Sequence, residues 1–122
     1  MKKVLLAVAE SAMHDFKPIL GEEQVELLVA QDGQELVDLA KEYHPDLIIL
    51  ERNIPVLDGL SALLLLKNDE RTKEIPIVAV CEGRCDQEEQ AKDAGCDAHL
   101  TRPLNPAKIR EVLKNFLRGG RT

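Results

Sequence analysis

Five short runs of apolar residues, separated by segments with helical periodicity, constrain the fold of this chain most. The runs lie at residues 4–8, 25–30, 47–50, 77–80 and, more weakly, 98–100. Parallel strands that helices cover on both faces have such continuous apolar sequences, whereas half-exposed strands alternate apolar and polar residues. The pattern therefore predicts an α/β fold with a doubly wound five-stranded parallel sheet. We expect one domain over residues 1–118 and a short tail over 119–122.

The segments between the runs predict the helices that cover the sheet. Ser11 is the expected N-cap of the first helix, which contains Pro18, a residue expected to kink or shorten it. The next two helices follow Asp32 and Asp58, and a polar fourth helix at 87–94 is expected to pack weakly. Asn105 is the expected cap of the last helix. The side chains expected to face the sheet are Ala12, Phe16, Ile19, Leu20, Leu36, Leu39, Ala40, Tyr43, Leu60, Leu63, Ile109, Val112, Leu113, Phe116 and Leu117.

Composition limits the functions that a chain of 122 residues can have. The net charge of −6 and the lack of a basic stripe argue against a nucleic-acid surface. The Leu run at 63–66 is far too short to cross a membrane, and the apolar run near the N-terminus is too short for a signal peptide, so we expect a cytoplasmic protein with no membrane partner. Three Cys do not predict a disulfide framework.

Several chemically active side chains follow the predicted strands directly. In a doubly wound sheet the functional crevice lies beyond the carboxyl ends of the strands. Glu10 follows the first strand, Glu51 the third, Cys81 the fourth and Arg102 the fifth. A pair of carboxylates can hold a divalent cation, and such a cation neutralises charge during phosphoryl transfer to a carboxylate.

This layout resembles the receiver domain of two-component response regulators over nearly the whole chain. The segments that carry the resemblance are KKVLLAVAES, PDLIILERNIPVLDG, PIVAV and GCDAHLTRPLNPAKI. Ile54 stands where the family's loop after the third strand usually has Met. The resemblance implies the flavodoxin-like receiver fold with strand order 2-1-3-4-5. It also implies a signalling module of a phosphorelay rather than an enzyme.

The positions that carry phosphoryl chemistry in this family differ in this chain, while Pro55, Gly59, Gly95 and Pro103 match the family. The family usually has two acids after the first strand, an Asp phosphoacceptor, a Thr or Ser after the fourth strand, an aromatic residue in the fifth strand and an essential Lys. The corresponding residues here are Ala9 and Glu10, Glu51, Cys81, His99 and Arg102.

These differences weaken a phosphoryl site. Without an acid at Ala9, any Mg²⁺ would bind weakly, through Glu10, Glu51 and the backbone carbonyl of Asn53. Glu51 is one methylene longer than Asp, which moves the carboxylate away from the usual nucleophile position. Glu51 and Arg102 could instead form a bidentate ion pair.

We therefore interpret the chain as a degenerate receiver that is not phosphorylated and acts by binding a protein. Its Glu51–Arg102 pair would replace a transient phosphorylated state or the resting Asp–Lys pair. The partner could be a histidine kinase, another receiver or an output protein, and a homodimer is also open. One alternative is a working receiver that accepts a phosphoryl group at Glu51 with Mg²⁺. Another is an unrelated small α/β enzyme, although no Gly-rich phosphate loop or Gly-x-Ser-x-Gly elbow is present.

Three further features have both a functional and a structural interpretation. Cys81, Cys85, Cys96 and His99 could be zinc ligands, or Cys81 and Cys85 a redox pair, but ordinary core or loop thiols are the default. His99 could sense pH or only fill the aromatic position. The third helix cannot bury four successive leucines, so Leu64 and Leu65 are candidates for an exposed partner surface.

Overall fold

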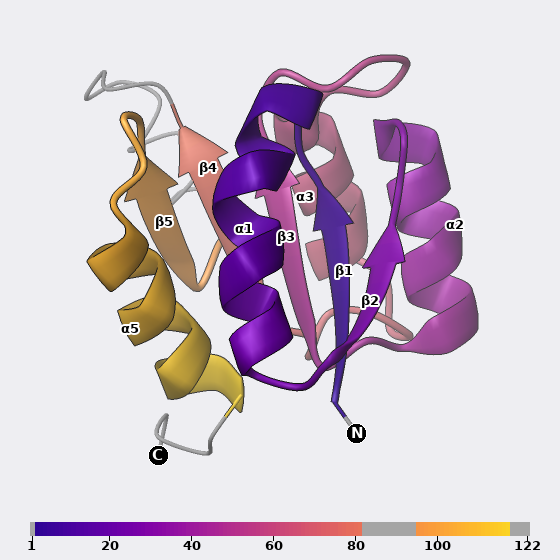
Figure 1. Cartoon of the computed structure of the whole chain (residues 1–122). Helices are drawn as coiled ribbons and strands as arrows, with labels where there is room; N and C mark the ends of the chain where they lie inside the picture. Colours follow the sequence, from indigo (N-terminus) through magenta and orange to yellow (C-terminus); the bar gives the residue numbers. More distant parts are fainter. Residues whose placement is uncertain (1, 82–94, 118–122) are drawn as a thin grey trace.

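The computed structural model describes residues 2–81 and 95–117 and contains one parallel sheet (Figure 1). The strands are β1 (Lys3–Ala7), β2 (Glu26–Val29), β3 (Leu47–Glu51), β4 (Ile77–Cys81) and β5 (Ala98–Thr101). They lie in the order β2-β1-β3-β4-β5, and every neighbouring pair is parallel. The predicted fold class and strand order are therefore confirmed.

Helices cover both faces of this sheet. They are α1 (Glu10–Glu22), α2 (Gly33–Tyr43), α3 (Gly59–Lys67) and α5 (Pro106–Leu117). Figure 1 shows α1 and α5 on one face and α2 and α3 on the other. The predicted helix at 87–94, residue Cys85 and the expected tail lie outside the described residues. In the part of the chain that the structure describes, no helix has the length and apolar character needed to cross a membrane.

The two-sided covering explains the continuous apolar runs. In β3, Ile48 and Leu50 pack into the core under α2 and α3, while Leu47 and Ile49 pack into the core under α1 and α5. Every residue of β3 and of β4 is buried. A sheet that is buried on both faces has no exposed face on which polar residues could alternate.

The start of α1 differs from the prediction. The helix begins at Glu10, and its N-cap is Ala9, which makes no side-chain capping bond, rather than Ser11. Pro18 lies inside α1 but does not end it, because the helix continues to Glu22. The following residues Ile19 and Leu20 are buried, so their packing against the sheet holds the last turn in place.

The expected inner faces of the helices are mostly confirmed. Tyr43 is the exception, because it is 40% exposed, and Val37 is buried in α2 although it was not expected to be. Tyr43 is the last residue of α2, and its ring lies 5.9 Å from the Lys3 ammonium, so it covers a cation rather than the core. In α5, the Asn105 side chain accepts a hydrogen bond from the backbone N–H of Ala107 at 2.8 Å, as expected of its cap.

Candidate functional site

The candidate site lies at the edge of the sheet where the parallel strands end (Figure 1). Glu51 is the last residue of β3, and Cys81 is the last residue of β4. Arg102 follows β5 directly, and Ala9 lies between β1 and α1. The topology therefore brings together residues that are far apart in the sequence.

The carboxylate of Glu51 is engaged by two separate donors. Its Oε2 accepts a hydrogen bond from Nη2 of Arg102 at 2.8 Å. Its Oε1 accepts a hydrogen bond from the backbone N–H of Ala9 at 2.7 Å. The Glu51 side chain is only 8% exposed, and that of Arg102 is 26% exposed. The expected Glu51–Arg102 pair is present, but it is not bidentate, because one oxygen bonds to the β1–α1 turn instead.

Backbone hydrogen bonds hold both members of the pair in position. The backbone N–H of Arg102 donates to the carbonyl of Cys81 at 3.0 Å, so the backbone of Arg102 is anchored to the end of β4. The N–H of Gly59 donates to the carbonyl of Arg52 at 2.8 Å, which closes the loop after β3. A Cβ at Gly59 would lie 2.3 Å from the carbonyl oxygen of Glu51, so this loop geometry requires glycine.

The residues expected to bind Mg²⁺ are only partly suited to it. Glu10 and Asn53 are exposed and border a cleft of about 540 Å³, which Ala9 also lines. Ala9 offers no side-chain ligand, and both oxygens of Glu51 already accept hydrogen bonds. Among these described residues, Glu10 then supplies the carboxylate that is left for a cation. Mg²⁺ requires near-octahedral oxygen coordination, and this donor set fits it poorly.

The Cys and His residues show no metal site within the described residues. Cys81 is buried at the end of β4, Cys96 is half-buried, and His99 is a half-buried residue of β5 opposite Ala79. Within residues 2–81 and 95–117, no group of three His, Cys, Asp or Glu side chains could hold a metal ion. Cys85 lies outside those ranges, so zinc binding and a Cys81–Cys85 redox pair stay open alternatives to the expected ordinary thiols.

Sequence reasoning missed the part of Ala9 in this site. The sequence marks Ala9 only as a position without an acid, but the backbone N–H of Ala9 donates to Oε1 of Glu51. Every residue except proline has such a donor, so no side-chain pattern could have indicated it. The length of Glu51 is the one usable signal, because the extra methylene extends its carboxylate further from β3 than that of Asp.

The fold and the placement of these side chains define a small α/β domain with an acidic site at the carboxyl ends of its strands. The model of the response regulator receiver domain family matches residues 9–114. The chain is 30% identical over 120 residues to the polar-differentiation response regulator DivK of Brucella ovis, covering 96% of this chain and 98% of that protein. This chain belongs to the response regulator receiver family.

Solved structures agree with the sequence comparisons. A putative response regulator from Chloroflexus aurantiacus superimposes with a TM-score of 0.89 at 21% identity, covering 96% of this chain and 98% of the other. The chemotaxis response regulator CheY4 of Vibrio cholerae gives a TM-score of 0.84 at 25% identity, covering 96% and 99%. The chain is thus a receiver-domain signalling module of two-component systems, a class whose members interact with proteins such as kinases. The alternative of an unrelated small α/β enzyme is wrong.

Proposed function

We propose that this chain is a receiver whose phosphoryl site is permanently occupied by the Glu51–Arg102 pair and that it acts by binding other proteins. The observation that carries this proposal is the engagement of both Glu51 oxygens, one by Ala9 and one by Arg102. The module would work in the cytoplasm, where a histidine kinase, another receiver or an output protein is its partner.

The negative charge of Glu51 supports a fixed signalling state. A phosphorylated carboxylate carries about −1.5 to −2 charges, whereas Glu51 carries one, so the replacement is partial. Glu51 nevertheless occupies the end of β3 and contacts the residue at the position of the family's lysine. Both contacts come from donors on other elements, the β1–α1 turn and the residue after β5. A single carboxylate therefore links three parts of the site without any chemical modification.

The same contacts oppose phosphorylation at Glu51. Each oxygen of Glu51 already accepts a hydrogen bond, and the side chain is only 8% exposed, which lowers its nucleophilicity and its access to phosphorus. Releasing Oε2 would break a hydrogen bond between charged groups, which costs about 1.5–3 kcal/mol. Poor Mg²⁺ binding would remove the charge neutralisation that phosphoryl transfer requires. We therefore propose that no Mg²⁺-dependent phosphorylation cycle operates in this protein.

A titration monitored by amide NMR tests this proposal. Mg²⁺ is added to millimolar concentration, followed by beryllofluoride, which copies a phosphorylated carboxylate. We expect no saturable shifts at the amides of Ala9, Glu51 and Arg102. The triple variant A9D/E51D/R102K, which restores the usual acids and lysine of the family, serves as the positive control. Saturable shifts in the wild-type protein would instead establish a competent phosphoryl site.

A further inference from the structure

The cleft of about 540 Å³ beside the Glu51–Arg102 pair has the shape and lining of a ligand site. Its walls are α1, the end of β2 with the residues that follow it, and the loop after β3 (Figure 1). Clefts of this size with apolar walls and a few polar groups are typical of small-molecule sites, and doubly wound sheets have them beyond the carboxyl ends of the strands. The apolar residues that line it are Val8, Met13, Val29, Ala30, Ile54 and Pro55.

The ionisable side chains that line this cleft all belong to α1. They are Glu10, His14 and Lys17, which are spaced four and three residues apart and therefore share one face of the helix. Glu10 and Lys17 lie two turns apart, which is roughly 10 Å along the helix axis. The α1 wall thus has an acid toward one end and a base toward the other, with His14 between them.

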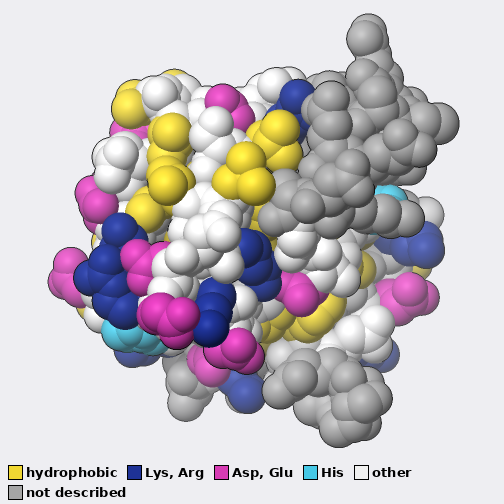
Figure 2. Space-filling model, turned by 180° about the vertical axis from the view of Figure 1, so that it is seen from behind, with side chains coloured by type: hydrophobic (Ala, Val, Ile, Leu, Met, Phe, Trp, Pro, Cys, Tyr) yellow, Lys and Arg dark blue, Asp and Glu magenta, His cyan; other side chains and the backbone are white. Residues whose placement is uncertain are grey.

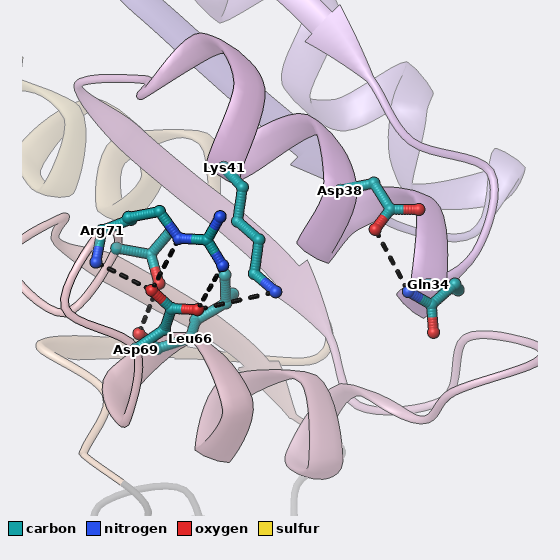
Figure 3. A network of polar contacts seen from close by, with 7 residues as sticks. Gln34, Asp38, Lys41, Leu66, Asp69 and Arg71 are labelled. Carbon is teal, nitrogen blue, oxygen red and sulfur yellow. Dashed lines mark hydrogen bonds and ion pairs between the residues drawn. The ribbon is translucent and has the colours of Figure 1, made fainter.

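These three side chains are exposed and make no ion pair or hydrogen bond within residues 2–81 and 95–117. Other charged groups of the protein are already paired. Lys41 and Arg71, for example, lie 3.5 Å and 3.0 Å from the same carboxylate, that of Asp69 (Figure 3). Paired charges have little to offer a ligand, whereas Glu10 and Lys17 can each exchange water for a charged group of a ligand.

The exposed leucines of α3 do not line this cleft. Figure 2 shows hydrophobic side chains gathered over the upper part of the opposite side of the molecule. Leu64 is 44% exposed and Leu65 is 50% exposed. Nothing among the described residues shows what covers them, so their part as a partner surface stays a prediction from the sequence.

We propose that the cleft binds a short linear peptide with an apolar side chain and free amino and carboxyl ends. The ammonium group of the peptide contacts Glu10, and its carboxylate contacts Lys17. Three extended residues span about 10 Å, which matches the separation of these two side chains along α1. The apolar side chain of the peptide packs between Met13 and Val29, which line facing walls of the cleft.

The separation of the two charges favours such a peptide over a simple ion. A cation alone would use Glu10 and leave Lys17 without a partner, and an anion alone would do the reverse. Neither would use the apolar lining. Because both charged side chains are exposed, each ion pair adds little affinity, and we expect a Kd on the order of 1 mM.

Peptide binding at this cleft goes beyond the function proposed above and does not require it. The cleft uses Glu10 and Lys17, whereas the phosphoryl site uses Glu51 and Arg102. The peptide experiment contains neither Mg²⁺ nor beryllofluoride, so either proposal can fail without the other.

An amide NMR titration of the full chain with the tripeptide alanyl-leucyl-alanine, up to about 10 mM, tests the proposal. We expect saturable shifts at the amides of residues 10–17, 29–31 and 53. The N-acetylated tripeptide lacks the ammonium group, and the C-terminal amide lacks the carboxylate. Each should bind about threefold more weakly than the free peptide, as expected for the loss of one exposed ion pair. Triglycine, which has no apolar side chain, should also bind at least about threefold more weakly.

Two variants assign each end of the peptide to one side chain. Glu10→Gln should remove the effect of acetylation on Kd and keep the effect of amidation. Lys17→Met should keep the effect of acetylation and remove that of amidation. The matched controls are Glu111→Gln and Lys108→Met, which remove the same charges at exposed positions of α5. They should leave Kd within about 1.5-fold.

Three results would overturn the proposal. The first is the absence of saturable shifts over the whole titration. The second is a set of shifts centred on other parts of the chain. The third is equal affinity for the free, acetylated and amidated peptides, or effects of the end groups that Glu10→Gln and Lys17→Met leave unchanged.

Discussion

Replacing Arg102 with Met tests the energetic role of the Glu51–Arg102 pair. In the variant, the Glu51 carboxylate would stay almost buried and would keep the Ala9 N–H as its one donor among the described residues. Removing one partner of a fully buried ion pair costs about 3–5 kcal/mol. The Arg102 side chain is 26% exposed, so water would reach the carboxylate and reduce this cost. We expect a loss of about 2 kcal/mol, which for this chain length lowers Tm by about 8 °C.

A double-mutant cycle separates the interaction from the effects of each substitution. Glu51→Gln keeps an oxygen for the Ala9 N–H but removes the charge that Arg102 contacts. Urea denaturation of the wild type, both single variants and E51Q/R102M should give a coupling energy of about 1.5 kcal/mol. A coupling energy below about 0.3 kcal/mol would refute the argument that the pair is energetically coupled.

Three other substitutions, at the start of α3 and in the segment after it, test the local contacts of this part of the fold by urea denaturation at pH 7. Gly59→Ala should lower the free energy of unfolding by at least about 2 kcal/mol, because the added Cβ would lie 2.3 Å from the backbone oxygen of Glu51. The control Gly21→Ala places its Cβ where no other atom lies within 4 Å, so it should be neutral or stabilising. Equal effects of the two substitutions would contradict this explanation. Asp58→Ala removes the α3 cap and should cost about 1 kcal/mol. The hydrogen bond from the backbone N–H of Ser61 lowers the pKa of Asp58 below its usual value. The stabilisation by the Asp58 carboxylate is therefore present at neutral pH and is lost as the pH falls through this lowered pKa. If Asp58→Ala destabilised the protein as much at pH 2 as at pH 7, the result would contradict this explanation. Thr72→Val removes the buried hydrogen bond of 2.7 Å from the Thr72 hydroxyl to the Leu66 carbonyl and should lower the free energy of unfolding by about 1 kcal/mol. An unchanged urea midpoint of unfolding would argue against that bond.

The strands could be predicted from the sequence because a strand that is buried on both faces has a continuous run of apolar residues. Each residue of β3 and β4 must be apolar to face one core or the other, apart from Glu51 at the end. The inner face of α5 was equally clear, since Ile109, Val112 and Leu113 repeat at helical spacing and are buried. These patterns depend on local periodicity, which the sequence contains in full.

The details that were missed depend on tertiary contacts. The cap of α1 is Ala9 rather than Ser11, and the N–H of Ala9 bonds to Glu51 at 2.7 Å. That bond comes from a residue 42 positions away, so local capping preference did not decide where the helix starts. Tyr43 has the spacing of a core residue, yet it contacts Lys3 at the end of α2. The pairing of Glu51 with Arg102 was predictable from their positions at the ends of the strands. That Arg102 contacts one oxygen of Glu51 rather than both was not predictable.

Intact-mass spectrometry after incubation with acetyl phosphate and Mg²⁺ tests the central claim most directly. If Ala9 and Arg102 engage both oxygens of Glu51, the wild-type protein should gain no phosphoryl group. The variant A9D/E51D/R102K, in which the usual acids and lysine of the family are restored, should gain one. A wild-type protein that gains the mass of one phosphoryl group, located at Glu51 by fragmentation, would contradict the account.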